Sequence, residues 1–180
     1  QGLDITRDKP AQVAQKGLIR SFQISSTFPH MTVLENVRIA LQRVRGSSFD
    51  FWRSKKVLDS LDQKALDLLE SVDLLGMADV EAVELPYGQK RALELATTLA
   101  LEPDMMLLDE PTQGMAQQDV ARVVDLIKKV AEGRTVLMVE HNLSVVQDLC
   151  DVITVLQRGS VLTEGDYRTV STDPRVLEAY

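Results

Sequence analysis

The stretch Met105-Met106-Leu107-Leu108-Asp109-Glu110 decides the fold of this chain. Its continuous apolar run predicts a strand buried on both faces, because a half-exposed strand would alternate polar and apolar side chains. Ligands of a parallel sheet bind beyond the carboxyl ends of the strands, so Asp109 and Glu110 would arrive where a phosphate and its metal bind. Asp109 suits holding a magnesium ion, and Glu110 suits orienting or deprotonating a water molecule. An apolar strand that ends in an acidic turn is also a common structural pattern.

Two further apolar runs, residues 136–139 and 152–156, predict strands that are likewise buried on both faces. Amphipathic helical stretches lie between the three runs, and this alternation predicts a parallel α/β unit. Arg158-Gly159 predicts a turn that makes a small hairpin with residues 161–162. Two short helices are expected to close the chain, the last with Asp173 as its N-cap and Pro174 in its first turn.

The N-terminal half predicts a short strand and two helices. Gly17-Leu18-Ile19-Arg20 indicates the strand. A helix with Gly76 as its C-cap is predicted from apolar residues that recur at steps of 3 and 4, which are Leu58, Leu61, Ala65, Leu68, Val72 and Leu75. A second helix starts near Gln89, after Pro86 and Gly88 punctuate a loop, and ends before Pro103. A glycine at such a helix start also lets backbone N–H groups approach an anion.

Composition places the chain among ordinary globular proteins. Its 180 residues are 44% hydrophobic and 26% charged, which indicates one domain, or one domain with a small insertion. The net charge of −7 disfavours general nucleic-acid binding. A single cysteine, Cys150, and the absence of any apolar run near the ~18 residues of a membrane span favour a soluble, cytosolic protein.

One locally basic stretch interrupts this acidic chain. Residues 35–56 carry six basic side chains against two acidic ones, with three aromatic residues among them, Phe49, Phe51 and Trp52. Such a run is typical of a solvated face, and its aromatic residues also indicate contact with a partner or a membrane surface.

Four motifs in this order resemble the nucleotide-binding subunit of an ABC transporter. They are Phe22-Gln23, LPYGQKR at 85–91, MMLLDEPT at 105–112 and MVEHN at 138–142, which resemble the Q-loop, the signature sequence, the Walker B strand and the switch histidine. Residues 19–23, 28–29, 32–37, 114–115 and 139–141 resemble more narrowly the ATPase subunits of branched-chain amino acid importers. Urea and short-amide importers are close relatives and remain alternatives. A lone histidine after a strand, such as His141, is also typical of a structural or capping residue.

The resemblance implies an α/β fold, a P-loop NTPase-like ABC ATPase core with a mainly parallel sheet and an inserted helical subdomain. It divides the chain into a core remnant with the Q-loop at 1–27, a helical subdomain with the signature at 28–103, and the remaining core at 104–180. ATP and Mg²⁺ are the implied cofactors. In this reading Gln23 senses the magnesium ion and the γ-phosphate, Asp109 holds the magnesium, Glu110 is the general base and His141 contacts the γ-phosphate. The ATP bound by the opposite subunit is contacted by Pro86, Tyr87, Gly88 and Gln89.

The implied partners are transmembrane permease subunits and a second ATPase subunit, identical or related. A substrate-binding protein is an indirect partner, and no nucleic acid is expected. The location implied is the cytoplasmic side of a prokaryotic membrane, as a peripheral subunit. An ABC ATPase without a transporter, as in DNA repair, is a weaker alternative, because long coiled-coil insertions and a second cassette are missing from these residues.

The sequence departs from the family pattern at several points. Pro86 and Tyr87 stand where many signatures carry Ser and Gly, and Gln117 replaces a frequent aspartate. No G-x-x-x-x-G-K-[ST] loop occurs, so we expect an N-terminally truncated chain that is inactive alone and prone to associate through an open sheet edge. The alternative function is a non-catalytic truncated module that pairs with an intact ATPase subunit.

Overall fold

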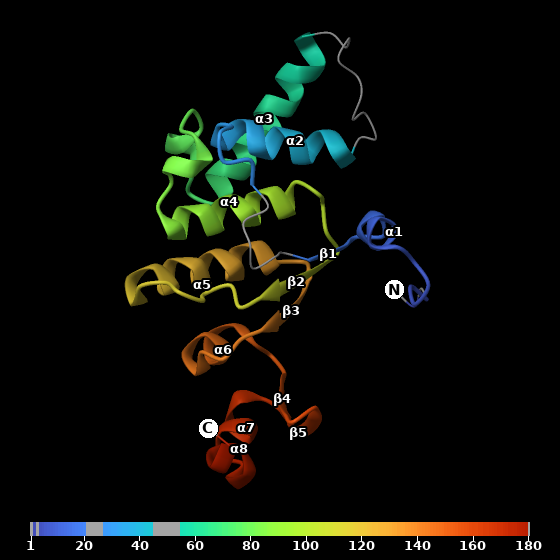
Figure 1. Cartoon of the computed structure of the whole chain (residues 1–180), viewed down its shortest axis with the longest axis vertical. Coiled ribbons are helices and arrows are strands. Elements are labelled where there is room, and N and C mark those ends of the chain that lie inside the picture. The colour runs from blue at the N-terminus through green and yellow to red at the C-terminus, as the bar shows by residue number, and fades with distance from the viewer. Residues whose placement is uncertain (1, 3, 21–26, 45–54, 180) are drawn as a thin grey trace. The chain divides into compact units, whose positions relative to one another are not determined.

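The computed structural model describes residues 2, 4–20, 27–44 and 55–179, which fall into the units Gln1–Val139 and Glu140–Tyr180 (Figure 1). The first unit contains α1 (Pro10–Gln15), β1 (Leu18–Arg20), α2 (Val33–Val44), α3 (Lys55–Ser71), η1 (Leu75–Met77), η2 (Ala82–Glu84), α4 (Tyr87–Leu99), β2 (Met105–Asp109), α5 (Gln117–Ala131) and β3 (Thr135–Val139). The second contains α6 (Leu143–Leu149), β4 (Ile153–Gln157), β5 (Ser160–Gly165), α7 (Tyr167–Ser171) and α8 (Pro174–Ala179). No helix of the described residues is long and apolar enough to span a bilayer.

The first unit is built on a parallel sheet with the order β1-β2-β3. Leu18 pairs with Met105, and Met105 with Thr135, so the three strands begin in register. The predicted strands at 18–20, 105–108 and 136–139 are therefore confirmed. Burial on both faces is wrong for β3, because Leu137 and Val139 are 57% and 60% exposed. Leu137 and Val139 share one face of β3, because side chains alternate along a strand, and that face is exposed in the described structure.

Helices α2, α3 and α4 pack against one another, and α5 lies beside α4 (Figure 1). Helix α4 is buried on almost all sides and thus forms the centre of this helical layer. An ion pair between Arg38 and Asp62, 2.6 Å apart, joins α2 to α3. Of the basic, aromatic stretch, residues 45–54 lie outside the described residues, so its predicted partner contact stays a prediction.

The end of α3 corrects the predicted C-cap. The helix ends at Ser71, and Gly76 lies in η1 instead of capping α3. Asp73 takes the left-handed conformation with φ 58°, and the Leu74 N–H donates to the Leu69 carbonyl at 2.8 Å. This is the hydrogen-bond pattern of a Schellman cap, in which aspartate replaces the usual glycine because its short polar side chain tolerates that region.

The start of α2 carries a capping box that the sequence reading missed. The Thr32 N–H donates to Glu35 Oε2 at 2.8 Å, and the Glu35 N–H donates to Thr32 Oγ1 at 3.2 Å. Asn36, buried one residue further on, accepts from the Phe28 N–H and donates to the carbonyls of Phe28, Met31 and Thr32. The residues before α2 are thus bound to its first turn, because a buried amide must find partners.

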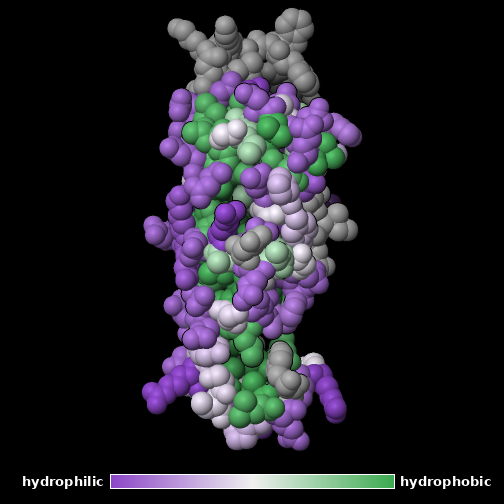
Figure 2. Space-filling view, turned by 90° about the vertical axis from the view of Figure 1, so that its left-hand side faces the viewer, coloured by the Kyte–Doolittle hydropathy of each residue, from purple (hydrophilic) through white to green (hydrophobic). Residues whose placement is uncertain are grey.

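The second unit corrects the third predicted strand. β4 is not part of the parallel sheet, since it pairs antiparallel with β5. The predicted turn is confirmed, with Arg158 and Gly159 both at positive φ, as a type I′ hairpin requires. Burial on both faces is wrong here too, because Leu156 is 67% exposed. Figure 2 shows apolar surface on this unit at the bottom of the view, and its exposed large apolar side chains are Leu143, Val152, Leu156, Val161 and Leu177.

The last two helices form as predicted. Asp173 precedes Pro174, and its Oδ1 accepts from the Arg175 N–H at 2.9 Å. Hydrogen bonds from the Arg175 side chain and backbone hold the pKa of the Asp173 carboxyl well below its usual value. The small apolar cluster of this unit consists of Val155, Val170 and Val176, with Ile153 and Leu162 packed against it.

Gly17 joins the starts of β1 and β2. Its carbonyl accepts from the N–H groups of Asp104 and Met105 at 2.9 and 3.0 Å, and its φ is +84°. A Cβ at this position would lie 2.7 Å from Asp104 Oδ2. The backbone conformation therefore requires glycine here, and the Asp104 side chain would also have to move to admit a Cβ.

We expect Gly17→Ala to lower the free energy of unfolding by about 1–3 kcal/mol, because alanine is strained at positive φ and its Cβ meets Asp104. Urea unfolding followed by circular dichroism measures the change. Gly76→Ala is the matched control, since Gly76 has no positive φ and no atom within 4 Å of an added Cβ. A Gly17→Ala chain as stable as this control would contradict the prediction.

Candidate functional site

The predicted carboxylates lie at the carboxyl edge of the parallel sheet, as expected. Asp109 is the last residue of β2, and Arg20 is the last residue of the neighbouring strand β1. Arg20 Nη2 donates to Asp109 Oδ2 at 3.0 Å, and both side chains are partly exposed. The sequence reading missed Arg20, although its place at the end of a strand paired with β2 was a usable signal.

Glu110 begins the turn that follows β2. Its N–H donates to the Val139 carbonyl of β3 at 2.9 Å, so the ladder of hydrogen bonds extends one residue beyond the strand. Its φ is +45°, a left-handed conformation that is uncommon for a residue other than glycine. The Glu110 carbonyl accepts from the Gln113 N–H at 3.1 Å. Strain of this kind persists only where the surroundings hold it, and it clusters at functional sites.

The N-terminus of α4 approaches the same turn. The Tyr87 hydroxyl donates to the Gln113 carbonyl at 2.9 Å and accepts from Arg91 Nη2 at 3.1 Å. Pro86 is the N-cap residue, and no side chain of the described residues caps the helix by a hydrogen bond. The helix begins at Tyr87, two residues before the predicted start at Gln89. Its first N–H groups form the positive end of the helix dipole, and no side chain in the described part of the chain accepts a hydrogen bond from them.

A buried ion pair fixes Arg91 one turn into α4. Arg91 Nη1 lies 2.7 Å from Glu94 Oε2, and each side chain is 9% exposed. The Arg91 guanidinium also lies over the Tyr87 ring, 5.4 Å from its centroid. Burial acts to lower the pKa of Arg91, but the contacts with Glu94 and Tyr87 outweigh it and raise that pKa. The sequence reading missed these contacts of Arg91, although its spacing of four from Tyr87 places both on one helix face.

No steric contact within the described chain requires glycine at Gly88. Its φ is not positive, and an added Cβ would meet Asp119 of α5 at 3.5 Å, an ordinary contact distance. Glycine near the start of a helix costs stability relative to alanine. The need for glycine is therefore expected to come from a molecule that approaches the helix from outside.

The structure brings together the predicted residues Asp109, Glu110 and Tyr87 through the turn after β2. Gln23 lies outside the described residues. His141 belongs to the second unit, where its side chain is exposed and its N–H donates to Glu140 Oε2 at 3.0 Å. Its neighbour Asn142 caps α6 by accepting from the Ser144 N–H, so the capping role weighed for His141 falls to the next residue. The roles of Gln23 and His141 beside Glu110 stay predictions.

The carboxyl edge fits a magnesium ion held by few protein ligands. The described residues contain no group of three or more potential ligand side chains that could hold a metal by themselves. Mg²⁺ keeps several waters and is usually bound by one or two carboxylates together with substrate phosphates. Asp109 offers a partly exposed carboxylate at the sheet edge where such phosphates bind. A bound cation would share this carboxylate with Arg20 or displace it.

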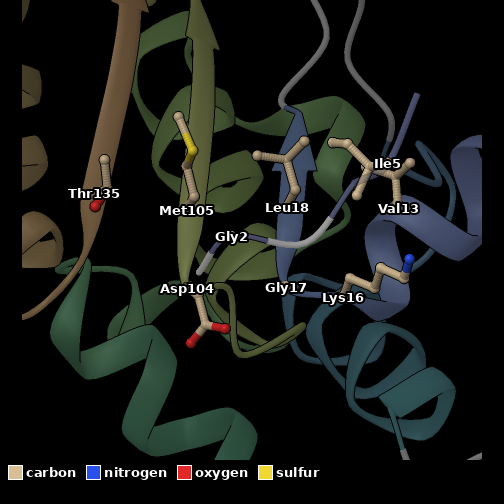
Figure 3. A pocket seen from close by; sticks show the side chains of 9 residues that line it. All are labelled: Gly2, Ile5, Val13, Lys16, Gly17, Leu18, Asp104, Met105 and Thr135. Atoms are coloured by element: carbon tan, nitrogen blue, oxygen red, sulfur yellow. The ribbon is translucent and has the colours of Figure 1, made fainter.

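A pocket of about 260 Å³ lies at the opposite edge of the sheet, where β1, β2 and β3 begin (Figure 3). Leu18, Met105 and Thr135, the first residues of the three strands, line it. Parallel sheets bind ligands at the carboxyl ends of their strands, and the candidate carboxylates lie there. We therefore place the functional site at the carboxyl edge and assign no chemistry to this pocket.

The chain is similar to several known proteins. A family described as "ABC transporter" matches residues 1–113. The probable branched-chain amino acid transport ATP-binding protein LivG of Archaeoglobus fulgidus is 33% identical, over all of this chain and 71% of its own length. The ADP conformation of the ATP-binding cassette MJ1267 superposes with a TM-score of 0.80 at 29% identity, over 99% of this chain and 73% of that one. A dimeric post-hydrolysis structure of the cassette MJ0796 with ADP and Pi has a TM-score of 0.71 at 26% identity, over 93% and 69% of the two chains.

We expect Gly88→Ala to raise the free energy of unfolding by up to about 1 kcal/mol, because alanine favours the helix and the folded chain has room for its Cβ. Urea unfolding checks this, with Gly17→Ala as the contrasting glycine that the chain itself requires. A clear loss of stability in Gly88→Ala would show that glycine is needed for folding and would remove this argument for an outside ligand.

Proposed function

The chain belongs to the ABC transporter family, and we propose that it supplies the ATP-hydrolysing subunit for import of branched-chain amino acids or related small amino acids and amides. The resemblance to LivG supports the substrate class, because that relative is named a probable branched-chain amino acid transport ATP-binding protein. The observation that carries the activity is the pair Asp109 and Glu110, at the carboxyl end of a strand inside a parallel sheet. Neighbouring carboxylates there suit phosphate chemistry.

Each candidate residue has a role in this proposal. ATP and Mg²⁺, when bound, supply the transferable phosphoryl group and the charge that neutralises it. Glu110 accepts the proton of the attacking water, and Asp109 holds the magnesium. His141 donates a hydrogen bond to the terminal phosphate, and Gln23 senses the metal and the γ-phosphate. Catalysis then rests mainly on positioning and charge stabilisation.

Pairing with a second ATPase subunit follows from α4. We propose that Pro86, Tyr87, Gly88 and Gln89 face the nucleotide of the opposite subunit. Two features support this: the helix start has no side-chain cap within the described residues, and Gly88 has no internal need to be glycine. An anion fits both features, because free N–H groups and the helix dipole attract negative charge. The similar cassette MJ0796 is dimeric with ADP and Pi bound, which supports the pairing of two subunits.

The other partners follow from the transporter family. We propose that the helical segment 28–103, containing α2, α3 and α4, meets a transmembrane permease, and that a substrate-binding protein acts through that permease. Residues 1–27 and 104–180 then contribute to the ATPase core. The site of action proposed is the cytoplasmic face of the membrane, where the chain is held peripherally.

Sequencing the coding DNA upstream of the Gln1 codon separates the two forms of this proposal. An open frame with G-x-x-x-x-G-K-[ST] after an apolar strand supports a complete transport ATPase. A stop codon or unrelated sequence supports the non-catalytic module that pairs with an intact subunit. In the second case the 180 residues are expected to increase ATP binding by an intact partner without hydrolysing ATP themselves.

In the full gene product, Glu110→Gln is expected to lower kcat for ATP hydrolysis by at least about 100-fold with little change in ATP binding, because the amide cannot accept the proton of water. Import of labelled leucine by cells that depend on this subunit should be lost with it. Glu132→Gln, the same change at an exposed residue near the end of α5, is the control. Turnover that survives Glu110→Gln would remove Glu110 from the role of general base.

His141→Ala is expected to lower kcat by about 100-fold in the same gene product, because the donor to the terminal phosphate is lost. Steady-state hydrolysis at saturating ATP measures this. His30→Ala, at an exposed residue before α2, controls for removal of an imidazole. An unchanged rate in His141→Ala would assign His141 to a structural role.

A further inference from the structure

A continuous series of hydrogen bonds runs from a buried ion pair in α4 to the backbone of Glu110. Glu94 Oε2 accepts from Arg91 Nη1, and Arg91 Nη2 donates to the Tyr87 hydroxyl. That hydroxyl donates to the Gln113 carbonyl, and the Gln113 N–H donates to the Glu110 carbonyl. In the order given, from the Glu94–Arg91 pair to Glu110, the donor–acceptor distances are 2.7, 3.1, 2.9 and 3.1 Å. The Tyr87 hydroxyl both accepts and donates, so its two hydrogen bonds polarise and strengthen each other.

The two ends of this series differ in how firmly they are held. Arg91 and Glu94 are buried and opposite in charge, so their pair is a fixed anchor within α4. At the other end Glu110 has φ +45°, and Gly114 has φ +75° within the same turn. Glycine adopts the left-handed region freely, but Glu110 needs its surroundings to keep it there. The turn therefore depends on contacts from outside itself.

Tyr87 is the link between the anchor and the turn. Its hydroxyl accepts from Arg91 on one side and donates to Gln113 on the other. The Arg91 guanidinium lies 5.4 Å from the centroid of its ring. The side chain is 47% exposed, so it is not a core residue that is retained for burial. Many family signatures carry a small residue where this chain has Tyr87. The place of its hydroxyl in the series gives the larger side chain a specific function.

We propose that Tyr87 is a positioning residue for Glu110, which holds the turn 110–114 against α4 so that the carboxylate and the nucleotide-facing helix start move as one body. This inference rests on the proposed function, since it assumes that Glu110 is the general base. It concerns the Tyr87 hydroxyl and is separate from the proposed place of the Tyr87 backbone at the nucleotide-facing helix start, because a hydroxyl acting through Glu110 affects turnover and not the affinity for ATP.

The first test uses the 180-residue chain and is independent of catalysis. Tyr87→Phe keeps the ring and removes the hydroxyl. We expect hydrogen exchange of the Gln113 amide to accelerate about fivefold, as for the loss of one ordinary hydrogen bond. Amides of β2 and α5 should accelerate less than the Gln113 amide, and the urea midpoint should fall by no more than the loss of one hydrogen bond explains. Exchange that is unchanged at Gln113, or that accelerates equally throughout the first unit, would overturn the proposal.

The second test uses the full gene product and separates this inference from the proposed function. Tyr87→Phe is expected to lower kcat for ATP hydrolysis about fivefold with an unchanged KM for ATP. Tyr167→Phe, the same change at the start of α7, is the matched control. A raised KM for ATP with an unchanged kcat would make the Tyr87 hydroxyl a nucleotide contact and overturn its positioning role. Loss of turnover in Glu110→Gln but not in Tyr87→Phe would refute this inference alone, whereas full turnover in Glu110→Gln would refute the proposed function.

Discussion

The hydrogen bond from the Glu110 N–H to the Val139 carbonyl is the contact on which the rest of the site depends. It keeps Glu110 bound to β3 after β2 has ended, while the left-handed φ of Glu110 turns the chain away from the sheet. Asp109 therefore stays at a strand end, beside Arg20, and Glu110 becomes the first residue of a turn. Two adjacent carboxylates acquire different surroundings in this way, and different surroundings are what two different tasks require.

Helix α4 determines where that turn goes. The helix contacts α2, α3 and α5, and its buried face continues around nearly the whole circumference. Such a helix has little freedom to shift, because close packing resists displacement. Arg91 and Glu94 are oppositely charged groups inside this packed environment, and a 2.7 Å contact between Nη1 and Oε2 joins them. The start of α4 and the turn after β2 consequently share one support, although they are separated in sequence.

The sequence predicted the strands of the parallel sheet and the hairpin because continuous apolar runs and a two-residue turn are local signals. It did not predict that β4 leaves the sheet or that Leu137 and Val139 are exposed. An apolar run reports the preference of its residues for burial, and not which neighbours are present to cover them. The cap of α3 was misjudged for a related reason: Gly76 was the expected residue, but Asp73 can also take a left-handed conformation. The box formed by Thr32 and Glu35 was readable from its spacing and was overlooked.

The residues of the site show the same difference between local sequence signals and tertiary contacts. Asp109 and Glu110 were found because they follow a strand, whereas Arg20 and Arg91 act through contacts that only the fold creates. Gly17 and Gly88 differ in a related way. Gly17 is required by its own φ and by Asp104, so the chain alone explains it. Gly88 has room for a side chain and a helical backbone that favours one, so the chain alone does not explain it. A residue that lowers stability without serving the fold is best explained by something that the fold binds, and Gly88 lies in the first turn of α4, which has no side-chain cap among the described residues.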